Sequence, residues 1–151
     1  MGKYEQYIKW VIALIIVFIV YKIAMIFKKE QQSEKSLEDM SRKIDTRKLS
    51  FTDISYINMA NALYNAMRDS GTNEATIFAN MRALKTDMDF YKLVEKFGIR
   101  KYTLTGDTLS GAFNLMFGSM NLDLLGWFEQ ELSEADLEEM RLILRKINVI
   151  I

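Results

Sequence analysis

Residues 10–27 read WVIALIIVFIVYKIAMIF, an apolar run of 18 residues that only Lys22 interrupts. As an α-helix this run would be about 27 Å long, close to the roughly 30 Å thickness of the hydrocarbon core of a bilayer. Lys22 lies near the end of the run, where a long side chain can reach the polar interface. The run therefore predicts a transmembrane helix. Its expected anchor residues are Trp10, Phe18, Lys22 and Phe27, with Lys28 and Lys29 directly after it.

A cleaved signal peptide and a buried core helix are the alternatives to a membrane anchor. No small-residue cleavage site follows the run, because residues 28–32 read KKEQQ. We therefore interpret the run as a retained anchor. Lys and Arg are more numerous after the run than before it, which favours a C-terminal domain on the cytoplasmic side. We expect a single-pass protein of a bacterial-type inner membrane.

Charge is divided unevenly along the chain. Residues 1–50 contain 10 Lys+Arg and 6 Asp+Glu, whereas residues 51–151 contain 10 and 14. An acidic C-terminal part argues against nucleic acid as a partner, because nucleic-acid-binding domains normally present a basic face. The chain has no Cys and no His. This excludes disulfides, thiolate chemistry, the usual zinc sites and any catalytic triad that contains His.

The pattern divides the chain into an N-terminal flank (1–9), the transmembrane helix (10–27), a charged stalk or linker (28–50) and a helical globular domain (51–151). The charged stretch holds 7 basic and 5 acidic residues. A thin apolar stripe of Leu37, Met40 and Ile44 has helical spacing, so the stretch either continues the anchor helix as a solvated stalk or forms a mobile linker.

Helix-start signals recur throughout the globular domain. Two residues, Thr86 and Ser133, are each followed three positions later by Asp, which is the spacing of a capping box. No strand is convincing, so the predicted fold is all-α: a transmembrane helix plus a bundle of about five short helices. The expected first residues of these helices are Thr52 or Asp53, Thr72, Thr86, Asn121 and Ser133.

The stretch 60–74, ANALYNAMRDSGTNE, resembles the start of an annexin repeat. In that family a helix ending in Ala-Met-Lys precedes a Gly-x-Gly-Thr-Asp-Glu loop and a second helix. The matching residues here are Ala66, Met67, Arg68, Gly71, Thr72 and Glu74, and further similarities are Phe97-Gly98 with Arg100, Asp123-Leu124 and Glu131-Leu132-Ser133.

The resemblance covers about residues 54–147 and implies an annexin-like bundle. It also implies a Ca²⁺ site of oxygen ligands, formed by the carbonyls of Met67, Asp69 and Gly71 and the bidentate carboxylate of Glu131. In annexins such sites bridge the protein to acidic phospholipid. The alternative is that Gly71 ends one helix, Thr72 caps the next and Glu131 is solvated. The overall design is also loosely similar to small membrane proteins encoded by phages or prophages.

Aromatic and apolar residues offer a second candidate surface. Trp127 and Phe128, with Phe113, Met116 and Phe117, form either an exposed partner-binding patch or, as is more usual for such residues, part of the core. The C-terminal residues 149–151 either pack onto the bundle or act as a free apolar tail.

Four acidic residues, Glu129, Glu131, Glu134 and Asp136, do not predict catalysis. They cluster around one helix junction, whereas glycoside hydrolysis needs two carboxylates on opposite sides of a cleft. We expect a non-enzymatic protein without a cofactor, calcium being the one ion that the resemblance allows. Residues 10–27 would contact membrane lipid, and residues 51–151 would bind a protein partner or another copy of the chain. The alternatives are a calcium- or phospholipid-responsive module, and a phage-encoded lysis, exclusion or virion-associated protein.

Overall fold

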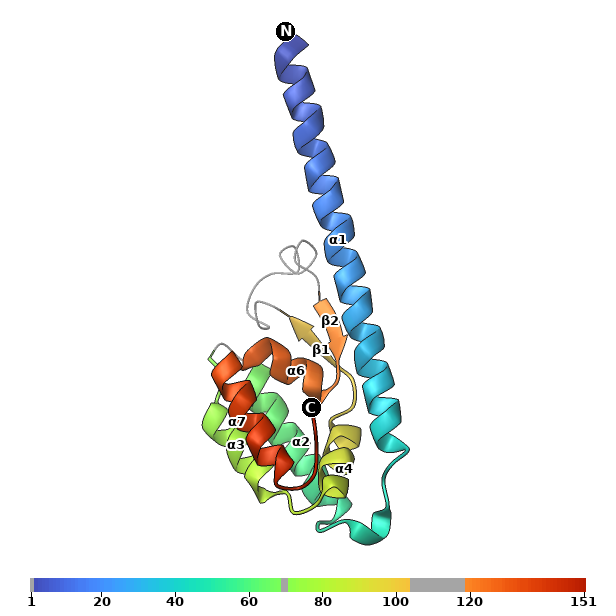
Figure 1. The fold of residues 1–151 in the computed structure, drawn as a ribbon, viewed down its shortest axis with the longest axis vertical. Coiled ribbons are helices and arrows are strands. Elements are labelled where there is room, and N and C mark those ends of the chain that lie inside the picture. Colours follow the sequence, from blue (N-terminus) through green and yellow to red (C-terminus); the bar gives the residue numbers. More distant parts are fainter. Residues whose placement is uncertain (1, 69–70, 104–118) are drawn as a thin grey trace.

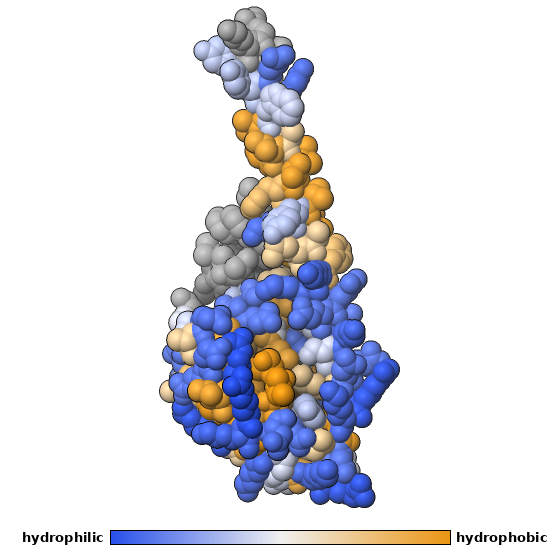
Figure 2. Space-filling model, viewed as in Figure 1, coloured by the Kyte–Doolittle hydropathy of each residue, from blue (hydrophilic) through white to orange (hydrophobic). Residues whose placement is uncertain are grey.

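The computed structural model describes residues 2–68, 71–103 and 119–151. Its longest element is α1 (Gly2–Ser41), one uninterrupted helix. The N-terminal half of α1 projects from the helical domain formed by the described residues after it, which we call the body (Figure 1). Within the described residues, α1 is the one helix long and apolar enough to cross a membrane, and none of its most apolar window is buried. Large apolar side chains along this half are exposed to the surroundings. Figure 2 shows part of this apolar surface on the face that it displays. A helix that lies in lipid presents such a surface.

The body after α1 is almost entirely helical, so the predicted all-α class is confirmed. A short 3₁₀ turn (Thr46–Lys48) leads into it, and its two short strands are β1 (Arg100–Thr103) and β2 (Ser119–Leu122). Among the described residues its helices are α2 (Asp53–Arg68), α3 (Glu74–Ala83), α4 (Asp87–Phe97), α6 (Leu124–Glu131) and α7 (Glu134–Arg145).

Both predicted capping boxes are present. At the start of α4 the Thr86 hydroxyl accepts from the backbone N–H of Asp89, whose carboxylate accepts from the Thr86 N–H in return. Ser133 and Asp136 make the same reciprocal pair at the start of α7. These signals are local in sequence, and each satisfies backbone N–H groups that a helix start leaves free.

Two predicted helix starts are wrong. The N-cap of α3 is Asn73, one residue after Thr72, and its side-chain oxygen accepts from the Thr76 N–H at 3.0 Å. Asn caps a helix at least as well as Thr, so the sequence offered two candidates in a row. The N-cap of α6 is Asp123, and the predicted start, Asn121, belongs to β2.

The strands β1 and β2 were not predicted. They pair antiparallel with Arg100 opposite Leu122 and Thr103 opposite Ser119. The α1 helix packs along β2. The side chain of Glu30 accepts from the backbone N–H of Asn121 at 2.8 Å. A helix thus covers the edge strand and satisfies a backbone donor there.

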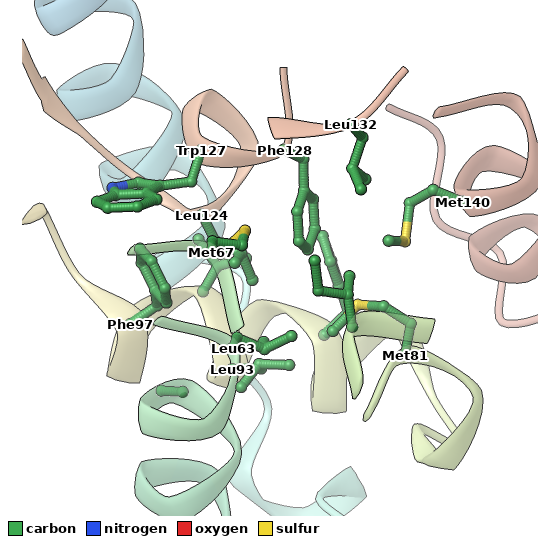
Figure 3. Packing of buried hydrophobic residues seen from close by; sticks show 14 of the residues in the cluster. Leu63, Met67, Met81, Leu93, Phe97, Leu124, Trp127, Phe128, Leu132 and Met140 are labelled. Carbon is green, nitrogen blue, oxygen red and sulfur yellow. The ribbon is translucent and has the colours of Figure 1, made fainter. Parts of the chain in front are cut away.

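The apolar core lies between the helices of the body (Figure 3). Trp127 and Phe128 are 2% and 1% exposed, so of the two alternatives for these residues the core is correct. Phe113, Met116 and Phe117 lie outside the described residues. At the C-terminus Val149 is buried and Ile151 packs against the core, whereas Ile150 is exposed.

A fully buried carboxylate, that of Asp89, connects three segments of the body. One oxygen accepts from the Ser50 N–H at 2.7 Å and from the Tyr56 hydroxyl at 2.6 Å. The other accepts from the N–H groups of Lys85 and Thr86 at 2.9 and 3.1 Å. Four donors therefore compensate the loss of hydration of this charge.

The same contacts set the protonation of both buried groups. Burial opposes ionisation of Asp89, but hydrogen bonds from Tyr56, Ser50 and Lys85 outweigh it and hold the pKa of Asp89 below its ordinary value of 3.8. Burial and the adjacent carboxylate raise the pKa of Tyr56 above its ordinary value of 10.0. At neutral pH the pair is therefore a carboxylate and a neutral phenol.

We expect Asp89→Asn to lower the free energy of unfolding of the full chain by about 2–3 kcal/mol, because the amide turns a donor toward donors that are already in place. Since the pKa of Asp89 is lower in the folded protein, its contribution is complete above about pH 4 and is lost as the pH falls through the folded value. Denaturant titration followed by circular dichroism measures both effects. Asp87→Asn, on the same helix, is the control and should change stability by less than about 0.5 kcal/mol. Equal losses for the two variants would contradict the assignment.

Candidate functional site

The junction between α1 and the body is the most distinctive feature of the molecule. The charged stretch after the anchor continues α1 to Ser41 and contacts β2, α4 and α6, so it lies along the body and does not separate it from the anchor. A connection of residues 42–52 then leads back to α2. The side chains that α1 turns toward the body, which we call the inner stripe, are Ile26, Ser33, Leu37 and Met40.

The sequence pattern identified only part of this stripe. Leu37 and Met40 have the predicted helical spacing and pack against the core. Ser33, which is only 3% exposed, was missed because a serine in a charged stretch carries no signal of burial. Its neighbour across the junction is Gly126 of α6, where an added Cβ would lie 3.0 Å from both Ser33 Oγ and Leu122 Cβ. A glycine is thus needed for α1 and α6 to approach this closely.

Polar contacts flank the stripe. Glu30 accepts from both the backbone and the side chain of Asn121, at 2.8 and 3.1 Å. Lys29 lies 3.8 Å from Glu129, so this predicted anchor residue is turned toward the body. Lys28 is exposed. Of the two lysines that directly follow the apolar run, one therefore contributes to the junction.

The side chain of Lys22 was expected to point toward the end of the apolar run and the polar interface, but it points toward the N-terminus of α1. Its ammonium lies 5.6 Å from the centroid of the Phe18 ring, one turn toward the N-terminus. Side chains of an α-helix lean toward its N-terminus, and a cation over an aromatic face is attracted by the ring quadrupole. Phe18 is thus the residue that contacts the one charge within the apolar run.

The loop singled out by the annexin resemblance lies beside the α6–α7 junction. Gly71 has a φ of +93°, and the Thr72 hydroxyl donates to the Glu131 carboxylate at 2.5 Å. Met67 lies in the last turn of α2, and Asp69 lies outside the described residues. Thr72, which directly follows the predicted ligand Gly71, is therefore in contact with the predicted carboxylate of Glu131. In the described part of the chain, no three acidic side chains gather to hold a metal ion, so such a site would depend on backbone carbonyls.

An aromatic cluster borders Glu131, and the sequence gave no signal for it. The Tyr102 and Trp127 rings meet edge to face with centroids 5.0 Å apart, and the Arg100 guanidinium lies 4.6 Å from the centroid of Tyr64. Burial, together with the charge and hydrogen bonding of Glu131, raises the pKa of Tyr102 above 10.0. Tyr102 is therefore neutral at physiological pH, and the Glu131 carboxylate beside it accepts from the Thr72 hydroxyl.

No family model, no curated protein and no solved structure matches the chain.

Gly126→Val should separate α1 from α6, since the new side chain would overlap Ser33 and Leu122. Overpacking of this kind costs about 1–3 kcal/mol, so amide hydrogen exchange in residues 29–41 should accelerate roughly fivefold or more in the full chain. Gln130→Val places the same β-branched side chain at a partly exposed position of α6. It should leave exchange in α1 unchanged, and equal acceleration in both variants would contradict the close approach.

Proposed function

We propose that the protein is a non-enzymatic, single-pass membrane protein that presents a small helical interaction domain directly at the membrane surface. The observation that carries the proposal is that α1 is one helix whose first half is exposed and apolar and whose second half packs along the body. The domain is thereby held beside the anchor, with no flexible spacer between them. It would position a protein partner at the membrane or assemble with copies of itself.

The engagement of the acidic residues supports a role other than catalysis. Glu129 pairs with Lys29, and Glu131 accepts from the Thr72 hydroxyl. Glu134 pairs with Arg141 at 3.2 Å, and Asp136 belongs to the capping box of α7. Each candidate acid or base from the sequence thus has a structural partner, whereas a pair of catalytic carboxylates would face a common cleft.

Exposed apolar side chains on the body supply a surface for a partner. Leu142 on α7 is 56% exposed and Ile150 is 88% exposed. Figure 2 shows apolar surface beside α7 and the C-terminal residues, surrounded by hydrophilic surface. Apolar surface within a polar rim is typical of protein–protein contact sites.

The positive-inside rule supports the cytoplasmic face of a bacterial-type inner membrane as the location of the domain. Lys28 lies directly after the apolar run and is exposed, and more basic residues follow in α1 and in the connection after it. Lys29 counts less as a lipid contact because it pairs with Glu129.

Site-specific photo-cross-linking in membranes of the native source tests the interaction. A photoreactive residue in place of Leu142 or Ile150 should give an adduct of defined mass, either with a second copy or with one partner protein. Gln31, on the exposed side of α1, is the control position and should give none. Monomer alone at both test positions would contradict the proposal, as would adducts of equal yield at Gln31.

A calcium-responsive module is a second candidate, favoured by the contact between Thr72 and Glu131. Calcium would have to displace the Thr72 hydroxyl from this carboxylate and recruit carbonyls of the loop. Millimolar calcium should then raise the melting temperature of the full chain, because an ion that binds only the folded state stabilises it. Glu131→Gln should abolish the rise, with Glu139→Gln on α7 as the control. The absence of any rise would remove this candidate.

A further inference from the structure

A pocket of about 190 Å³ lies between the second half of α1 and the helices α6 and α7. Ser33 and Ser36 of α1 line one side. Asp123, Phe128 and Leu137 line the other. The pocket thus combines apolar walls with a few convergent polar groups, which is the composition of small-molecule sites.

Asp123 lines this pocket, and its carboxylate has an incomplete set of hydrogen-bond partners among the described residues. Its side chain caps α6, with one carboxylate oxygen accepting from the Gly126 N–H at 2.9 Å. The residue is only 1% exposed, and among the described residues no group donates to its second oxygen. The hydroxyl of Ser36, on the opposite wall, is buried and equally without a partner. A buried polar oxygen without a hydrogen-bond donor is costly, so these two oxygens favour a ligand that donates hydrogen bonds.

The two cationic side chains that line the pocket are already paired with other residues. Lys29 lies 3.8 Å from Glu129, and Arg141 lies 2.7 and 3.2 Å from Glu138 and Glu134. A positive charge for Asp123 would therefore come from the ligand. An ammonium group fits best, because it forms a charge-assisted hydrogen bond with a carboxylate and keeps further N–H groups for a hydroxyl.

We propose that this pocket binds the primary ammonium group of a small amphiphilic ligand, held by Asp123 Oδ2 and Ser36 Oγ. A short alkyl body would pack against Phe128, Leu125 and Leu137. Cavities of about 150 Å³ accommodate a molecule of the size of benzene, so the volume here suits a ligand of about six heavy atoms.

This chemistry has two sources, a free alkylamine and the headgroup of an ethanolamine phospholipid. The α1 residues that line the pocket, Lys29 to Ser36, follow the apolar run by two to nine positions. At about 1.5 Å per residue they lie about 3–14 Å beyond the end of the run, a range that overlaps the polar interface of a bilayer, about 5–8 Å deep on each side. Lipid headgroups therefore reach one end of the pocket.

Thermal melting of the full chain in a neutral maltoside detergent, with propylammonium chloride as the probe, tests the site. A saturable rise in melting temperature is expected. Tetramethylammonium has the same charge without an N–H donor, and 1-propanol has no charge, so both should give no rise. Equal responses to propylammonium and tetramethylammonium would overturn the proposal. It would also be overturned if propylammonium gave no saturable response in detergent and the protein melted at the same temperature in nanodiscs of phosphatidylethanolamine and of phosphatidylcholine.

Two variants assign the binding to the pocket. Asp123→Asn preserves the helix cap, since Asn also caps helices, and should weaken propylammonium binding at least tenfold. Ser36→Ala should weaken it severalfold, and it decides the question if Asp123→Asn fails to fold. Glu139→Gln, an exposed acidic residue of α7 that does not line the pocket, is the matched control and should bind within twofold of the wild type. Unchanged binding in Ser36→Ala and in a folded Asp123→Asn would overturn the assignment.

Nanodiscs distinguish the two sources of the ammonium group. Phosphatidylethanolamine presents N–H donors, whereas phosphatidylcholine presents a quaternary ammonium group without them. If the source is lipid, phosphatidylethanolamine should raise the melting temperature relative to phosphatidylcholine and suppress the response to added propylammonium. If the source is a free amine, propylammonium should raise the melting temperature equally in both lipids. Either result supports an ammonium site.

Discussion

The buried carboxylate of Asp89 is the interaction on which the arrangement of the body depends. It joins the connection that follows α1, through Ser50, to Tyr56 of α2 and to the start of α4. Because α4 also packs against α1, fixing this connection fixes where the long helix meets the body. A single charge can do this because four donors surround it, whereas a partly paired charge at the same depth would destabilise the fold.

The two halves of α1 have different environments, although they form one helix. Apolar side chains cover the first half on all sides. The second half packs through the inner stripe defined above, contacts the body with Lys29 and Glu30 beside the stripe, and turns its other charged residues outward. The transition falls near Ile26, the first member of the stripe. The same helix thus has an exposed apolar surface, long enough to cross a membrane, and a core-facing surface, and the second of these covers the edge of β2.

Signals that are local in sequence predicted most of the fold. The apolar run, the capping boxes at Thr86 and Ser133, and the helix Asp53–Arg68 were all identified because their residues interact within a few positions. The strands were missed because they are four residues long and pair across 15 intervening residues. At the candidate sites, the proximity of Thr72 to Glu131 was implied only by the annexin resemblance. The unpaired oxygen of Asp123 was not predictable at all, because the residue is buried where α1 packs against α6, and these two helices are far apart in the sequence.

Because α1 is continuous, it also fixes the rotational orientation of the body around the helix axis. In a helix each residue advances the chain by about 1.5 Å and turns it by about 100°. One residue inserted between Phe27 and Glu30 would therefore rotate the whole body about 100° around the helix axis. In the proposed membrane arrangement, a different side of the body would then face its neighbours. Seven inserted residues would almost restore the original azimuth, about 20° short of it, while placing the body about 10 Å farther from the bilayer. The spacing of the chain between anchor and body thus encodes which side of the domain its neighbours meet.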